Sequence, residues 1–87
     1  MAELHLPTTL APLFAGLPRR LDVDAATVRD AIDSLERQWP GLRDRLCEPG
    51  PELRCHIHVY VDRERASLDT PIEPRSRVDV IAAISGG

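Results

Sequence analysis

The chain has 87 residues, 43% of them hydrophobic but 3% aromatic, a composition that suits one domain with a small core of aliphatic side chains. Its formal net charge of −3 argues against nucleic acid as the main partner, since neutralising phosphates needs clustered positive charge. Neither a membrane span of ~20 apolar residues nor a signal peptide is evident, because Glu3 and His5 precede the apolar segment 6–17 and prolines interrupt it.

The N-terminal part of the chain predicts two strands joined by a loop. Residues 3–6 alternate between polar and apolar side chains, as do residues 19–24, and this alternation is typical of a strand with one buried face. Residues 7–18 contain prolines and a glycine that break regular structure. Beneath this loop we expect three apolar side chains to pack, those of Leu10, Leu13 and Phe14. Together the two strands predict an N-terminal antiparallel hairpin.

The clearest predicted element is an amphipathic helix that begins after Asp24 and ends before Pro40. Asp24 is the predicted cap, because its carboxylate can accept hydrogen bonds from the free N–H groups of the first turn. One apolar stripe recurs at helical spacing, made of Val28, Ile32, Leu35 and Trp39. Pro40 cannot continue the helix, and residues 42–46 predict one further turn whose two leucines close the end of the core.

The C-terminal part of the chain predicts a long strand, a short edge strand and a final strand. After a turn at 47–52, residues 53–62 alternate strictly. Four side chains are predicted to point inward (Cys55, Ile57, Val59 and Val61) and four outward (His56, His58, Tyr60 and Asp62). An edge strand is expected near residues 66–68, and residues 77–84 predict the last strand, with Val78 and Val80 inward and Ile81 outward. One helix covers only one face of such a sheet, so the other face stays open.

This order of elements, with its Gly-Gly ending, resembles the MoaD/ThiS-type ubiquitin-like sulfur-carrier family. The resemblance rests on AATVRDAIDSLERQWPGLRDRL, LRCHIHVYVD and VDVIAAISGG, and the first two stretches are most similar to the branch that serves cysteine and thio-metabolite biosynthesis. It implies an α+β, ubiquitin-like β-grasp fold: a mixed four- to five-stranded sheet, one main helix on one face, and a flexible C-terminal tail. The predicted domain is 1–84 and the tail 85–87. The chain departs from the family in having PRSR at 74–77 where a Gly-Asp turn is usual, and Ala82 and Ala83 where paired prolines are frequent.

The resemblance implies that the chain is a protein co-substrate and not an enzyme. An E1-like adenylating enzyme of the MoeB/ThiF type would use ATP and magnesium to adenylate the carboxylate of Gly87. A persulfide sulfur donor would then convert it to a thiocarboxylate for a sulfur-accepting synthase. Gly86 and Gly87 lack a Cβ, so the backbone can pass through a narrow channel that shields the reactive carbonyl from water. Ile84 and Ser85 precede them as predicted partner-binding residues, and no bound cofactor is expected.

The open sheet face is the second predicted site. His56, His58, Tyr60 and Ile81 would lie together there, and in the family this face docks the partner enzymes; the alternative is an ordinary solvated face. The H-x-H pair lacks a third ligand, so no metal is predicted. Cys55 is expected in the core, whereas Cys47 beside the turn could form a mixed disulfide with a partner. Both thiols are expected to stay free in a reducing cytoplasm.

Two other functions remain open from the sequence. A ubiquitin-like modifier would share the activation step and attach Gly87 to lysines of target proteins. A plain β-grasp interaction domain would carry an inert tail. All 11 basic residues are arginine, which we attribute to a GC-rich genome, the alternative being selection against self-acylation by an activated terminus. No internal lysine is present to form an isopeptide bond. Among the carrier pathways, the sequence does not decide between cysteine, thio-metabolite, molybdopterin and thiamin thiazole biosynthesis.

Overall fold

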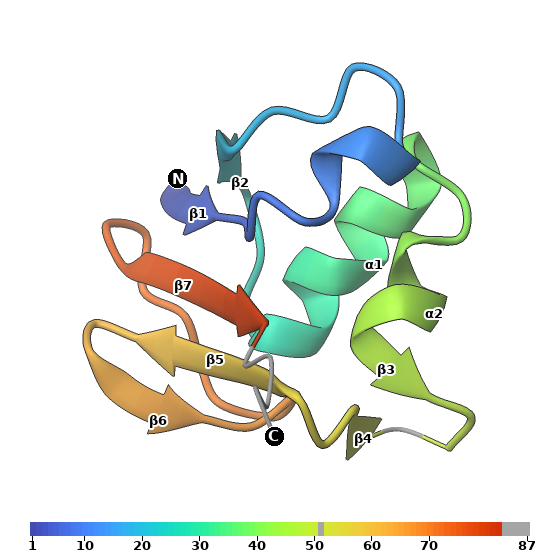
Figure 1. The fold of residues 1–87 in the computed structure, drawn as a ribbon. Helices are drawn as coiled ribbons and strands as arrows, with labels where there is room; N and C mark the ends of the chain where they lie inside the picture. The colour runs from blue at the N-terminus through green and yellow to red at the C-terminus, as the bar shows by residue number, and fades with distance from the viewer. Residues whose placement is uncertain (51, 83–87) are drawn as a thin grey trace.

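The computed structural model describes residues 1–50 and 52–82, whose largest feature is a five-stranded mixed sheet in the order β2-β1-β7-β5-β6 (Figure 1). β1 (Ala2–His5) pairs antiparallel with β2 (Arg20–Val23), which confirms the predicted hairpin. On its other side, β1 pairs parallel with β7 (Arg77–Ala82). β5 (Ile57–Val61) is antiparallel to β7 and carries β6 (Glu64–Ala66) as the edge strand.

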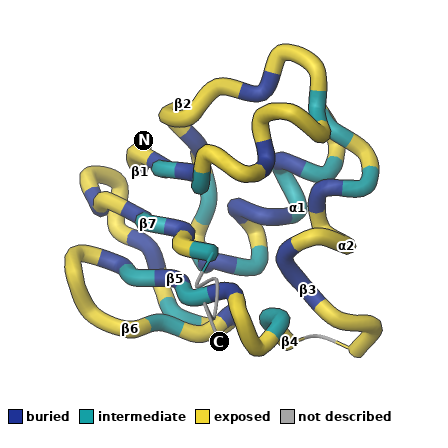
Figure 2. Tube along the Cα trace, in the orientation of Figure 1, coloured by how far each residue is buried: buried dark blue, intermediate teal, exposed yellow. Residues whose placement is uncertain are grey.

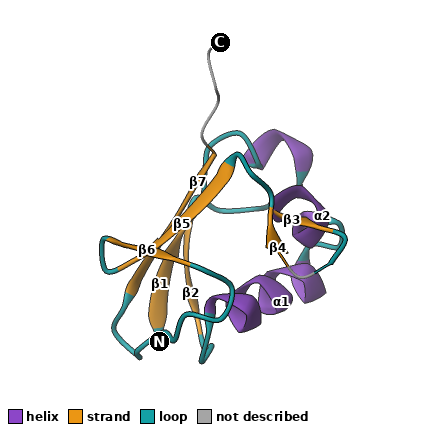
Figure 3. Cartoon of the chain, turned by 90° about the horizontal axis from the view of Figure 1, so that it is seen from below, coloured by secondary structure: helices purple, strands orange, loops and turns teal. Residues whose placement is uncertain are grey.

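Helix α1 (Val28–Gln38) covers one face of this sheet, as the alternation of the strands requires (Figure 3). Its apolar stripe is buried, and Leu35 is 0% exposed. The inward residues of the central strands meet it, among them Val59 and Val78, also 0% exposed. Trp39 is half-buried at the helix end, where its indole nitrogen donates a hydrogen bond to the carbonyl of Ala15 (3.1 Å). The core is therefore aliphatic and lies between one helix and one sheet face (Figure 2).

The predicted helix cap was wrong. Thr27, not Asp24, is the N-cap residue, and its hydroxyl accepts a hydrogen bond from the Asp30 N–H (3.2 Å). Residues 24–27 stay outside the helix because the chain here bonds to the segment before β7: the Ile72 N–H donates to the Ala26 carbonyl (2.8 Å), and Thr27 forms a bridge with Pro71. A contact with a segment far along the chain thus delays the start of the helix.

The end of α1 follows the prediction, and it is stabilised by hydrogen bonds to Glu36 that the sequence did not indicate. Gly41 adopts a φ of +99°, a left-handed conformation that favours glycine. The Glu36 carboxylate then accepts hydrogen bonds from the N–H groups of Gly41 (3.1 Å) and Arg43 (2.8 Å). These bonds lower the pKa of Glu36, with the bond from Arg43 the larger cause. Helix α2 (Leu42–Leu46) begins here, and its two leucines are 0% exposed, as predicted.

The strand predicted over residues 53–62 is shorter than expected. β3 (Cys47–Glu48) and β4 (Glu52–Leu53) form a separate two-stranded ribbon. Arg54 then turns the chain, because its N–H donates to the Leu46 carbonyl and its Nε to the Asp44 carbonyl. The ladder with β7 therefore starts only at Ile57.

This turn reverses the two predicted cysteine environments. Cys47 is 8% exposed and belongs to the core, whereas Cys55 is exposed. The prediction that Cys55 is a core residue was wrong, and the burial of Cys47 argues against the mixed disulfide with a partner that the sequence had left open. A second correction concerns the loop 7–18, which contains the short helix η1 (Ala11–Leu13): Leu10 is buried and Phe14 half-buried, but Leu13 is 51% exposed. An irregular loop has no repeat from which the inward direction can be read. Among the described residues, no helix has the length and apolar character needed to cross a bilayer.

Candidate functional site

The candidate site begins at β7, the central strand of the sheet. β7 pairs with β1 on one side and β5 on the other, and its last residue, Ala82, lies opposite Ile57. Val78 and Val80 are buried beneath it, as predicted. The predicted site residues that follow (Ile84, Ser85, Gly86 and Gly87) lie outside the described residues, so their roles stay predictions.

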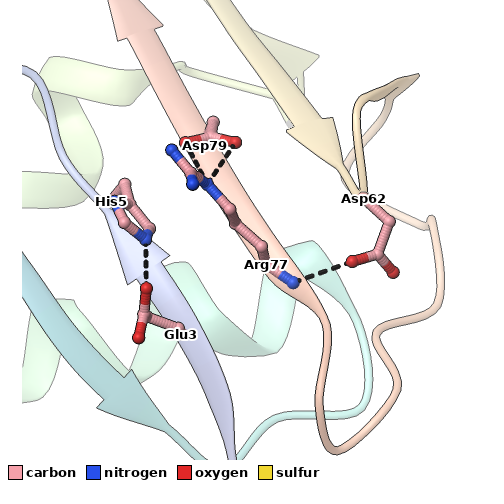
Figure 4. Close-up of polar contacts among 5 residues, drawn as sticks. All are labelled: Glu3, His5, Asp62, Arg77 and Asp79. Atoms are coloured by element: carbon pink, nitrogen blue, oxygen red, sulfur yellow. Dashed lines mark hydrogen bonds and ion pairs between the residues drawn. The ribbon is translucent and has the colours of Figure 1, made fainter.

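The start of β7 is fastened by a side chain that sequence reasoning did not single out. Asp62 follows β5 with a φ of +51°, and its carboxylate accepts a hydrogen bond from the Arg77 N–H (2.9 Å) (Figure 4). It also accepts one from the Ser76 hydroxyl (2.9 Å). The bond from Arg77 and then the bond from Ser76 lower the pKa of Asp62. Ser76 is 2% exposed, and its hydroxyl oxygen also accepts a hydrogen bond from the Glu73 N–H (3.0 Å). The unusual PRSR segment therefore closes its turn through Ser76 and Asp62.

The open face brings together three of the four predicted docking residues. Ile81 is 46% exposed and lies directly opposite His58 in the ladder between β7 and β5. Tyr60 is two residues farther along β5 and is half-buried, like His58. The face thus offers one exposed aliphatic side chain beside two half-buried aromatic rings, next to the end of the last strand. That composition is typical of a protein-binding surface with an apolar centre.

His56 does not belong to this face. It lies in the turn before β5 and lines a different surface depression, together with Leu13, Phe14 and Arg45. The predicted grouping assumed that the strand continued back to residue 53, and the turn at Arg54 ends that continuity.

His58 carries a polar atom without a partner. Its Nδ1 is buried and accepts or donates no hydrogen bond within the described part of the chain. Over residues 1–50 and 52–82, no group of three or more His, Cys, Asp or Glu side chains is placed to hold a metal ion. The His58 ring is half-buried, and its residue lies opposite Ile81 in the ladder between β5 and β7.

The other half of the open face, over β1 and the start of β7, is polar. The His5 ring contacts the Glu3 carboxylate (2.5 Å), and the Nε of Arg77 donates to both carboxylate oxygens of Asp79 (3.1 Å each) (Figure 4). These pairs lie on neighbouring strands, since Glu3 is opposite Arg77 and His5 is opposite Asp79. Within each pair, the carboxylate is matched by a basic side chain. The polar half of the face is therefore separate from the apolar centre at Ile81.

The face of the molecule that carries α1 holds a hollow of about 440 Å³, with Cys47 among its lining residues. Burial raises the pKa of the Cys47 thiol, although Arg43 and Arg29 oppose that shift. A thiol with a raised pKa is a weak nucleophile at neutral pH. Cys47 therefore acts as a small core side chain.

Comparisons with known proteins agree on one family. The sequence model of the ThiS family matches residues 12–87. Small archaeal modifier protein 1 of Haloferax volcanii is 34% identical over 86 residues, covering 98% of this chain and 99% of its own. The sulfur carrier protein CysO of Mycobacterium tuberculosis is 27% identical over 90 residues, covering 97% and 96%.

The fold is confirmed by solved structures. A chain in the crystal structure of the Amycolatopsis orientalis BexX/CysO complex superposes with a TM-score of 0.86 at 24% identity, over 100% of both chains. The predicted ubiquitin-like β-grasp, with a mixed sheet and one main helix on one face, is therefore correct. With a family match over most of its length and a full-length relative at 34% identity, the chain belongs to the ThiS family of ubiquitin-like sulfur carriers.

Proposed function

We propose that this protein carries sulfur as a thiocarboxylate on Gly87. Family membership supports the carrier class, and the geometry of β7 is the observation that carries the proposal. β7 is the central strand, fastened at its start by Asp62 and paired on both edges. Five residues follow Ala82, and five extended residues reach at most about 18 Å. The carboxylate can therefore enter a partner's site while the globule stays outside.

The proposed chemistry needs no catalytic side chain of this chain. A Gly87 carboxylate oxygen attacks the α-phosphate of ATP, and magnesium pyrophosphate leaves, which creates an acyl-adenylate. A persulfide sulfur attacks the carbonyl carbon and AMP leaves, which creates an acyl disulfide. A thiol then cleaves the S–S bond, so that the thiocarboxylate and a new disulfide result. The partner enzyme supplies the ATP site and excludes water from the adenylate.

The open face is the proposed dock for the adenylating enzyme and for the sulfur-accepting enzyme. Ile81, His58 and Tyr60 lie beside the end of β7, so a partner that takes the terminus also covers them. His56, in the turn before β5, would contact only a partner that extends beyond this face. The two free cysteines fit a reducing compartment, and we place the protein in the cytoplasm.

Intact mass spectrometry tests the proposal. The chain is incubated with the MoeB/ThiF-type adenylating enzyme of its host, magnesium ATP, a persulfide donor and a thiol. We expect AMP formation and a mass increase equal to the replacement of one oxygen by sulfur. A variant that lacks Gly87 is the control and should form neither. Absence of AMP with the full chain would refute the proposal.

A second candidate function is protein modification. It is favoured by the similarity to a protein named as a small archaeal modifier, which is the 34% identical relative. Both functions need the adenylate and differ in the final nucleophile, sulfur or a lysine amine. Intact mass spectrometry of the protein purified from its host distinguishes the two functions. Adducts of high mass indicate modification, and the thiocarboxylate alone indicates a carrier. If deletion of Gly87 leaves the host pathway unaffected, the third alternative holds, an interaction domain with an inert tail.

A further inference from the structure

A groove of about 850 Å³ lies on the open face and is lined by residues of the β1–β2 hairpin and of β7, which pairs with β1. We call it the basic groove, and the residues that matter for its chemistry are His5, Arg19, Arg20, Arg77, Asp79 and Ile81. It lies against β7, the strand that leads to the terminus, and Ile81 forms part of its wall. A partner that docks on the open face at Ile81 would therefore also contact this groove.

The groove carries positive charge that the described residues do not neutralise. Arg77 donates to Asp79, and the His5 ring contacts Glu3. Arg19 and Arg20 are both exposed, and neither forms an ion pair with any acidic residue in the described part of the chain. This excess is unexpected in a protein of net charge −3.

The two arginines are held on a rigid part of the fold. Arg20 belongs to β2 and lies opposite His5 of β1. The Arg19 carbonyl accepts a hydrogen bond from the Leu6 N–H (2.7 Å), which fixes the backbone just before the strand. At the opposite end of the hairpin, Asp22 faces Glu3. The hairpin is thus acidic at the end near Met1 and basic at the end where Arg19 and Arg20 lie.

We propose that the basic groove binds an acidic segment of a protein partner, with its carboxylates on Arg19 and Arg20 and an apolar side chain on Ile81. The proposal rests on the proposed function, and its occupant is a segment of the adenylating enzyme. Arginine pairs with carboxylate through two parallel hydrogen bonds, which gives orientation as well as attraction. The exposed aliphatic Ile81 favours protein over nucleic acid, since two unpaired arginines neutralise too few phosphates.

Charge reversal with a matched control tests the groove. The variant R19E/R20E removes the positive charge, and R37E/R75E makes the same change in net charge at two exposed arginines outside the groove. The probe is the purified MoeB/ThiF-type adenylating enzyme of the host, and calorimetry measures the Kd at low and high salt. We expect R19E/R20E to weaken binding by about tenfold or more at low salt and to reduce the salt dependence. The control should stay within about twofold, and Ile81→Ser should weaken binding at both salt concentrations.

Equal weakening by both double variants would overturn the proposal, because it would show a response to net charge alone. An unchanged Kd in R19E/R20E would overturn it as well. Binding of ATP alone to the chain, lost in R19E/R20E, would assign the groove to phosphate and not to a protein segment. Circular dichroism on each variant checks that the fold is intact.

Measuring AMP in the same samples separates this inference from the proposed function. A chain that binds the enzyme through the arginines but forms no AMP supports the groove and refutes the function. If wild type and R19E/R20E both form AMP and the enzyme has the same KM for the two proteins, the proposed function is supported and the groove is refuted. If the wild-type chain does not bind the adenylating enzyme at all, both the proposed function and the groove are refuted.

Discussion

Asp62 shows how one side chain secures the strand on which the proposed function depends. Its carboxylate accepts hydrogen bonds from the N–H of Arg77, the first residue of β7 (Figure 4), and from the hydroxyl of Ser76, the residue before it. Because these bonds favour the ionised form, the pKa of Asp62 is lowered in the folded state. Nothing in the alternating pattern of residues 53–62 indicated this role, since Asp62 reads there as one more outward side chain.

The lowered pKa predicts how stability depends on pH. The stabilisation from Asp62 is complete above its unfolded-state pKa of about 4 and is lost as pH falls through the lower folded-state value. Asp62→Asn removes this contribution, so the stability gap between wild type and variant should be largest near neutral pH and shrink in acid. Urea denaturation over a series of pH values measures the gap. The exposed Asp22→Asn on β2 is the control, and a gap for Asp62→Asn that stays constant with pH would contradict the prediction.

At the scale of elements, the periodicity of apolar residues correctly predicted which main helices and strands form. Hydrogen bonds to distant segments of the chain determine the residues at which these elements begin and end. The stripe Val28, Ile32 and Leu35 indicated α1 and its buried face correctly. The cap was misplaced because residues 24–27 pair with the segment around Ile72, a contact that no local pattern shows. The long strand was misplaced for the same reason, since Arg54 bonds back to the α2 region. His56 and Cys55 were consequently assigned to the wrong surroundings.

The corrected cap can be tested by a pair of variants. Thr27→Ala removes the hydroxyl that accepts from the Asp30 N–H and should lower the free energy of unfolding by about 1 kcal/mol. Asp24→Ala, at the position that the sequence favoured, should change it by less than about 0.5 kcal/mol. Chemical denaturation measures both. A larger loss in Asp24→Ala than in Thr27→Ala would restore the original assignment.

For the molecule as a whole, the parallel pairing of β1 with β7 determines how the fold presents its last strand. Since the two strands run in the same direction, Met1 and the end of β7 lie at opposite ends of the sheet (Figure 3). Composition and element order predicted the fold class, the single helix layer and the open face. They could not show that Arg19 and Arg20 line the same groove as Ile81, because that arrangement depends on strand order.

The small core makes stability sensitive to a single buried leucine. Leu35 lies on the face of α1 that packs against the sheet and is 0% exposed. Leu35→Ala should lower the free energy of unfolding by about 2–5 kcal/mol, because apolar burial is lost and a cavity remains. Domains of this size have little stability in reserve, so much of the total would disappear. Leu13→Ala makes the same chemical change at a residue that is 51% exposed, and it should cost less than about 1 kcal/mol. Urea denaturation compares them. Equal losses would mean that the loop 7–18 packs on the core as the sequence first indicated, and that Leu13 is not available on the surface.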